Sequence, residues 1–161
     1  MKREEQVMEP YDSTPDTLAH IRRVQELLAD MQHRLATRAR LHDASKLEEP
    51  EKSAFDRATP RLKVLTYGSP DYTASLADMH VALEHHYTHN SHHPEHHLDG
   101  IAGMSLLDLL EMLCDWKAAG ERHADGDIHE SLRVNTLRYG IDLQLANILW
   151  RTIADLDEGS E

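Results

Sequence analysis

Apolar residues recur at helical spacing in the first part of the chain. The positions that share this spacing are Ile21, Val24, Leu28, Met31 and Leu35. Intervals of three and four residues place them on one face of an amphipathic helix. Thr14 suits the N-cap of such a helix, and Pro15 suits its first turn. The pattern predicts a helix of about five turns from residue 14, with His20 on its apolar side.

The same periodicity predicts helices along the rest of the chain. We expect them at residues 35–47, from Pro50 onward, and at 73–89, 105–119, 128–139 and 141–156. Ser105 with Asp108 three residues later has the pattern of a capping box, which predicts the start of the helix at 105–119. Loops are expected at residues 61–66, after Thr59-Pro60, and at residues 90–103. No stretch alternates with a period of two, so the predicted fold class is all-α. We expect one helical domain over residues 1–161, with flexible ends at 1–13 and 157–161.

The chain is acidic, with 17 Lys and Arg against 29 Asp and Glu and a net charge of −12. Such a chain should repel a nucleic-acid backbone, so we expect no sequence-independent binding of nucleic acid. A bound divalent ion would reverse this locally and allow a small phosphorylated molecule to bind. The longest apolar-rich stretch, residues 101–113, contains Ser105, Asp108 and Glu111, so no membrane span is expected. With no visible signal peptide and a single cysteine, Cys114, we expect a cytoplasmic protein.

Histidine is the most unusual feature of the composition. Seven of the 13 histidines lie between residues 85 and 97. A separate pair, His42-Asp43, lies among apolar and small residues, where an unpaired carboxylate would be costly to bury. Imidazole and carboxylate groups together favour transition metals such as Zn, Fe, Mn, Co and Ni. Lys46 follows within one turn and could neutralise either a phosphate or the charge of Asp43.

Helical periodicity predicts which side of its helix each of the other candidate ligands occupies. On the helix that ends near residue 89, His86 falls at the edge of the apolar side, whereas His85 points almost opposite. Asp115 falls on the same stripe as Asp108 and Glu111, which by itself predicts a solvent-exposed carboxylate. The acidic residues 48–51 are similarly expected to form an exposed turn.

Taken together, these elements resemble the HD superfamily of metal-dependent phosphohydrolases. That superfamily carries a His, a His-Asp pair, further His ligands and a distal Asp on successive helices, which here correspond to His20, His42, Asp43, His86, His93 and Asp115. Residues 41–46 are similar to its HDxGK form, with Ser45 in place of Gly. Residues 92–100 look like the HHExxDG segment of its cyclic-dinucleotide branch, but the Gly-Tyr-Pro that should follow is absent, so that substrate is not carried over. The strings HDxSK, HHxxxNxHHPE and EMxxDW more closely resemble an uncharacterised family of small bacterial and phage proteins.

The resemblance implies an HD-type fold and a centre of one or two divalent transition-metal ions. It implies that Asp43 holds or bridges the ions and that Asp115 turns inward, against the helical periodicity. Lys46 would balance the charge of a small phosphorylated substrate, for which a nucleotide is one candidate. Asn90 and Arg122 would be further contacts for this substrate. The choices between His85 and His86, and between His92 and His93, stay open. So do two other functions, an HD-type diiron oxygenase and a non-catalytic metal-binding or host-interaction protein, and the oligomeric state.

Overall fold

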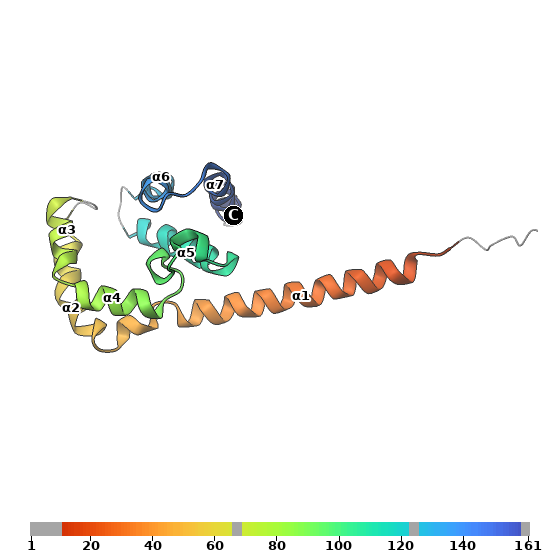
Figure 1. The fold of residues 1–161 in the computed structure, drawn as a ribbon, viewed down its shortest axis with the longest axis horizontal. Coiled ribbons are helices and arrows are strands. Elements are labelled where there is room, and N and C mark those ends of the chain that lie inside the picture. Colours follow the sequence, from red (N-terminus) through yellow and green to blue (C-terminus); the bar gives the residue numbers. More distant parts are fainter. Residues whose placement is uncertain (1–10, 66–68, 123–125, 159–161) are drawn as a thin grey trace, which may run out of the picture. The chain divides into compact units, whose positions relative to one another are not determined.

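The computed structural model describes residues 11–65, 69–122 and 126–158. Over these residues the structure contains helices and no strand, so the all-α prediction is confirmed (Figure 1). The α-helices are α1 Thr14–Leu41, α2 Glu51–Leu62, α3 Pro70–Ala77, α4 His80–His89, α5 Leu106–Gly120, α6 Ile128–Tyr139 and α7 Leu143–Glu158. Three short 3-10 helices are η1 Ala44–Leu47, η2 Pro94–His96 and η3 Gly100–Gly103. The described helices include none with both the length and the apolar character needed to cross a membrane. The chain divides into two units, Met1–Thr37 and Arg38–Glu161.

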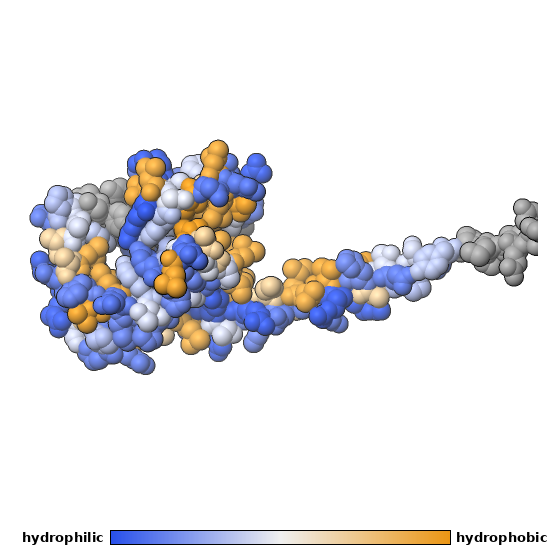
Figure 2. Space-filling model, viewed as in Figure 1, coloured by the Kyte–Doolittle hydropathy of each residue, from blue (hydrophilic) through white to orange (hydrophobic). Residues whose placement is uncertain are grey.

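Helix α1 begins at Thr14, as predicted, but it is longer than expected. It runs without a break for 28 residues to Leu41, so the prediction of a separate helix from residue 35 was wrong. The reason is local, because residues 36–40 contain no glycine or proline to interrupt the hydrogen bonding. No residue of α1 is buried, and Figure 2 shows apolar side chains gathered along it.

The chain turns sharply after α1, at Asp43. This residue has φ 55°, in the left-handed region that Asp tolerates better than most residues. It is the N-cap of η1, and the backbone N–H of Lys46 donates to the Asp43 carbonyl at 2.9 Å. The predicted helix over residues 35–47 is therefore the end of α1 followed by a single tight turn.

Between α2 and α4 the helix boundaries differ from the prediction in three places. Helix α2 passes through Pro60 and ends at Leu62, because a proline in the last turn removes only one hydrogen bond. The helix expected at residues 73–89 begins earlier, with Ser69 capping the backbone N–H of Tyr72 at 3.2 Å. It is also divided, since α3 ends at Ala77 and α4 begins at His80. The loop expected at residues 61–66 was wrong for residues 61 and 62, which belong to α2, and residue 66 lies outside the described residues.

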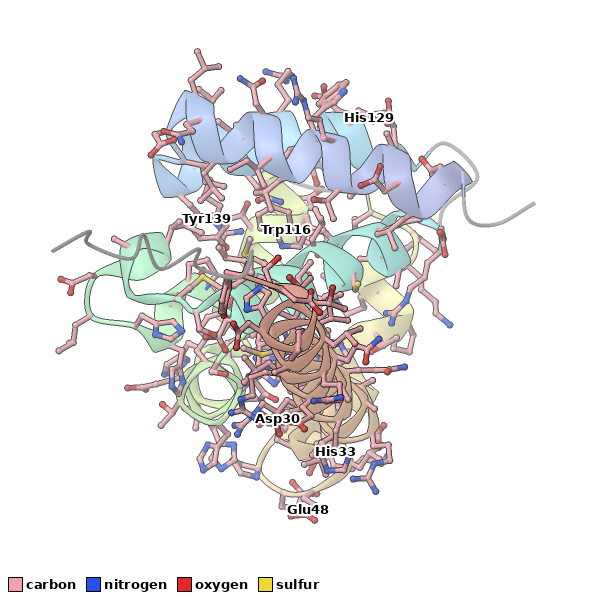
Figure 3. All side chains as sticks on the ribbon, turned by 90° about the vertical axis from the view of Figure 1, so that its right-hand side faces the viewer. Asp30, His33, Glu48, Trp116, His129 and Tyr139 are labelled. Atoms are coloured by element: carbon pink, nitrogen blue, oxygen red, sulfur yellow. The ribbon has the colours of Figure 1, made fainter. Side chains whose placement is uncertain are left out.

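The second unit has its hydrophobic core where α5, α6 and α7 meet. Its buried members are Leu113, Leu132, Ile141, Leu149 and Ile153. Trp116 of α5 stacks on Tyr139 of α6, with ring centroids 6.1 Å apart, and Figure 3 shows both between the helices. At its start, α5 has the capping box expected from Ser105 and Asp108. This packing fixes α5, so its polar side is held in place for the site described next.

Candidate metal centre

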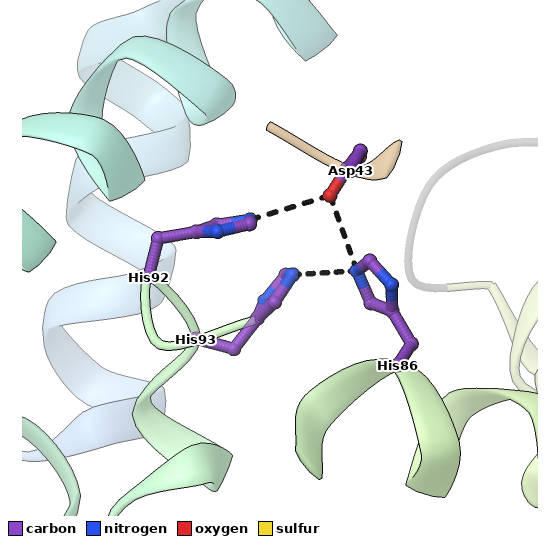
Figure 4. A group of neighbouring side chains, drawn as sticks. All are labelled: Asp43, His86, His92 and His93. Atoms are coloured by element: carbon purple, nitrogen blue, oxygen red, sulfur yellow. Dashed lines mark hydrogen bonds and ion pairs between the residues drawn. The ribbon is translucent and has the colours of Figure 1, made fainter. Parts of the chain in front are cut away.

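Four side chains of the second unit converge on one point, which we call position A (Figure 4). Asp43 comes from the turn after α1, His86 from α4, and His92 and His93 from the segment before η2. Position A is outlined by the Nε2 atoms of His86, His92 and His93 and by Asp43 Oδ1. His86 Nε2 lies 2.9 Å from His93 Nε2 and 3.3 Å from Asp43 Oδ1. His92 Nε2 lies 3.5 Å from the same oxygen, and one ligand atom from each residue falls within 4.8 Å of the others.

Two atoms at position A are buried without a hydrogen-bond partner, Asp43 Oδ1 and His92 Nε2. Leaving a buried polar atom unpaired costs about 1–3 kcal/mol, so native structures seldom tolerate it without a reason. Both atoms are good ligands for a cation, and both face the other ligand atoms of position A. The residues present therefore fit a transition-metal ion at this point.

A second group of ligand atoms adjoins the first, and we call it position B. His42 Nε2 lies 3.6 Å from Asp43 Oδ2 and 3.6 Å from Asp115 Oδ1. Asp43 thus presents one carboxylate oxygen to each position, the geometry needed to bridge two cations. The ammonium of Lys46 donates a short hydrogen bond to Asp43 Oδ2. Position B is also more open, because the His42 side chain is 30% exposed, whereas those of His86 and His92 are 2% exposed.

A largely buried carboxylate on α5, Glu111, orients two of the histidines. Its Oε1 accepts hydrogen bonds from His42 Nδ1 at 2.9 Å and from His92 Nδ1 at 3.2 Å. Its Oε2 accepts from Arg38 Nε at 2.6 Å. Because each Nδ1 carries the donated proton, Nε2 is the atom of each ring that can offer a lone pair to a metal. For His42, whose pKa is raised to about 10, Nε2 must first lose its own proton. Hydrogen bonds of this kind are typical of metal-ligating histidines.

Glu51 does the same for His86. It is the first residue of α2, where the helix dipole favours a negative charge, and it is 0% exposed. Its Oε2 accepts from His86 Nδ1 at 2.9 Å and from Ser45 Oγ at 3.0 Å, and its Oε1 accepts from His85 Nδ1 at 2.7 Å. The expectation that residues 48–51 form an exposed turn was therefore wrong for Glu51, although Glu48 is exposed at the edge of its turn (Figure 3).

The charges at the centre are coupled. The carboxylates of Asp115 and Glu111 raise the pKa of His42 to about 10. Burial, together with the neighbouring His92 and His86, lowers the pKa of His93 to about 3. Burial alone would raise the pKa of Asp43, but the charge and hydrogen bond of Lys46 and the charges of His42 and His86 together outweigh it, so the pKa falls below its usual value. Asp43 is thus ionised and His93 neutral at pH 7, the forms in which both residues bind metals.

The predicted inward direction of His86 agrees with the structure, in which this residue is 1% exposed. His85 is partly exposed and belongs to no ligand group among the described residues; its Nδ1 donates to Glu51, and its ring stacks on His89 with centroids 4.0 Å apart. Of the other pair, both His92 and His93 reach position A, because the 3-10 turn after them brings the two rings to 4.2 Å from each other. The assignment of these residues as ligands stays a prediction.

The polar stripe of α5 faces the centre and not the solvent. The periodicity correctly placed Asp108, Glu111 and Asp115 on one side, but its interpretation as an exposed side was wrong. Asp108 is 6% exposed and accepts hydrogen bonds from Arg38 Nη2 and Ser91 Oγ, both at 2.6 Å. The string EMxxDW contained a signal for Glu111, since it pairs this residue with Asp115 one turn later.

Three other residues from the sequence analysis belong to none of the ligand groups found among the described residues. His20 is exposed on α1, within the first unit. Asn90 is buried, and its amide donates to Ser45 Oγ and to the His86 carbonyl, both at 2.8 Å, so it braces the centre. Arg122 is exposed just after α5. Over the described residues, no group of metal-ligand atoms includes His20. The roles assigned to these three residues stay predictions.

Comparison with known proteins identifies a family but no function. Residues 9–154 match a family of unknown function, DUF5662, and this match spans most of the chain. The chain therefore belongs to DUF5662. No curated protein and no solved structure matches it.

Proposed function

We propose that this DUF5662 member is a metal-dependent phosphohydrolase acting on a small phosphorylated molecule, with nucleotides as the first class to test. The observation that carries the proposal is Asp43, whose two carboxylate oxygens face two adjoining groups of ligand atoms. The resemblance of the HDxSK string to the HD superfamily supports the same chemistry. A cytoplasmic location belongs to this proposal.

The ligands divide between the two positions. His86, His92 and His93 would hold an ion at position A, and His42 and Asp115 would complete position B, with Asp43 shared by both. When bound, divalent ions supply Lewis acidity, which activates water and polarises a phosphoryl oxygen. Glu51 and Glu111 keep the imidazole rings in the orientation that this binding needs.

Substrate would approach from the side of position B. His86 and His92 are buried behind position A, whereas the Lys46 side chain is 33% exposed. Lys46 can therefore leave Asp43 and balance the charge of an incoming phosphoryl group. This interaction would strengthen as negative charge develops on the phosphoryl oxygens in the reaction. Arg38 is already occupied by Asp108 and Glu111, which leaves Lys46 as the cation at the open side.

A metal analysis followed by a substrate screen tests the proposal. The purified protein should contain, or bind stoichiometrically, one or more of Fe, Mn, Zn, Co and Ni. With Mn, Co, Ni or Fe added, it should release phosphate from at least one compound of a nucleotide and phosphomonoester panel, and Asp43→Ala should abolish both metal binding and release. Tight metal binding without any turnover would instead favour the non-catalytic metal-binding or host-interaction protein. Iron-dependent consumption of oxygen would favour the diiron oxygenase.

A further inference from the structure

We infer that the ammonium of Lys46 takes the place of a second metal ion at position B, so that the resting protein binds one ion tightly, at position A. The inference rests on the metal-binding part of the proposed function. Its basis is a direct contact, because Lys46 Nζ donates a hydrogen bond to Asp43 Oδ2, the oxygen that faces position B. A metal ion ligated by this oxygen would need the same lone pairs.

The backbone holds Lys46 in this place. Asp43 and Lys46 are three residues apart in a 3-10 turn, where side chains at this spacing lie directly above each other. The ammonium also lies 5.1 Å from the centre of the Phe55 ring, within the range of a cation–π interaction. These two contacts, with Asp43 and with Phe55, therefore keep the charge at position B.

A count of charges explains why one ion is preferred. Four carboxylates surround the two positions, Asp43, Asp115, Glu51 and Glu111. Lys46 offsets one of them, whereas the charge of Arg38 is already matched by Asp108. One divalent ion then leaves a single negative charge. A second ion would turn this into a single positive charge for as long as Lys46 stays, so the second ion has to displace the ammonium from Asp43.

Position A has no such competitor among the described residues. Its Asp43 oxygen lacks a hydrogen-bond partner, as does His92 Nε2, and its other ligand atoms are imidazole nitrogens. Three neutral imidazoles and one carboxylate make a set that suits a single transition-metal ion. The first ion should therefore bind at position A. The Lys46 charge should affect the affinity for this ion less than it affects the affinity for a second ion at position B.

Titration of the metal-free protein with Co²⁺, followed by calorimetry and elemental analysis, tests the inference. The natural protein should bind one ion tightly and a second at least about 100-fold more weakly, since a unit charge within a few ångströms acts by several kcal/mol at the effective dielectric of a protein. Lys46→Met, which keeps the apolar stem, should bind the second ion about 100-fold more tightly. Lys46→Arg keeps the charge and should behave like the natural protein. Lys52→Met is the matched control, because Lys52 pairs only with the exposed Asp56.

A further variant tests whether the second ion binds at position B. Asp115→Asn combined with Lys46→Met should return the protein to one ion, because the added site is at position B. Two tight ions in the natural protein, or an unchanged second affinity in Lys46→Met, would overturn the inference while leaving phosphohydrolase activity intact. Absence of any Co²⁺ binding would overturn it together with the metal centre. The expected stoichiometries in a protein that hydrolyses no phosphoester would support the inference and reject the proposed reaction.

Discussion

Replacing Glu111 by Gln should weaken metal binding although this residue is not a ligand. The Glu111 carboxylate is the common acceptor for His42, His92 and Arg38. A glutamine of the same shape keeps one acceptor oxygen, but its amide nitrogen can only donate. The amide nitrogen of the glutamine would therefore face another hydrogen-bond donor, either an imidazole N–H or the guanidinium of Arg38.

The size of the effect follows from the bonds lost. At least one hydrogen bond to a charged group is removed, and such a bond contributes about 1.5–3 kcal/mol. If this loss falls on the ring orientation of His42 or His92, the dissociation constant for the metal should rise about 10–100-fold. Glu111→Ala should have at least the effect of Glu111→Gln, because it leaves both Nδ1 atoms without this acceptor.

Calorimetric titration with Zn²⁺ or Co²⁺ measures the change. Nitrogen NMR of the histidine rings adds a readout that a general loss of stability would not produce, since Glu111→Gln should shift the Nδ1 protonation of His42 and His92. Glu121→Gln is the control, because Glu121 is exposed after the same helix and pairs only with Lys117. Equal affinities in the Glu111 and Glu121 variants, with the ring tautomers unchanged, would refute the reasoning.

Three further predictions follow from the same contacts. Asp115→Ala should lose the weaker second ion at position B and the activity, whereas Glu121→Ala should retain both, as titration with Co²⁺ and the phosphate assay will measure. The pKa of Asp108 is lowered to about 2 from 3.8 because hydrogen bonds from Ser105, Ser91 and Arg38 outweigh its burial. Its contribution of about 2 kcal/mol to stability is therefore present above pH 4 and lost as the pH falls towards 2; in chemical unfolding of the metal-free protein, Asp108→Asn should flatten this pH dependence. Chelator should lower the melting temperature measured by calorimetry, because an ion that binds only the folded state stabilises it by mass action; an unchanged melting temperature would argue against an assembled centre.

The sequence was informative wherever the outcome depended on local spacing. Helical periodicity predicted the fold class, and it predicted that His86 rather than His85 faces inward. The start of α1 at Thr14 and the capping box at Ser105 depend on hydrogen bonds within one turn, so they too could be predicted. Periodicity also correctly placed the polar residues Asp108, Glu111 and Asp115 on one side of α5.

Burial of the carboxylates could not be predicted in the same way. A stripe of Asp108, Glu111 and Asp115 has the same spacing whether it faces water or a ring of donors. The difference is made by Arg38, 70 residues or more away in the sequence, and by His42 and His92. Glu51 was misjudged for the same reason, because its partners on α4 come more than 30 residues later. Such partners become visible only when the tertiary fold is known.

Asp43 illustrates how the local and tertiary requirements meet in one residue. Its left-handed backbone ends α1 and begins η1, a place where glycine would carry no steric cost. Asparagine or glycine would satisfy the turn, but neither would supply a carboxylate whose two oxygens face different groups of ligands. The backbone strain is therefore better explained by the centre than by the turn, since strained conformations persist where the surrounding structure requires them. The same turn that directs Asp43 inward also sets Lys46 above it, so that the shared ligand and its competing cation are fixed by four consecutive residues.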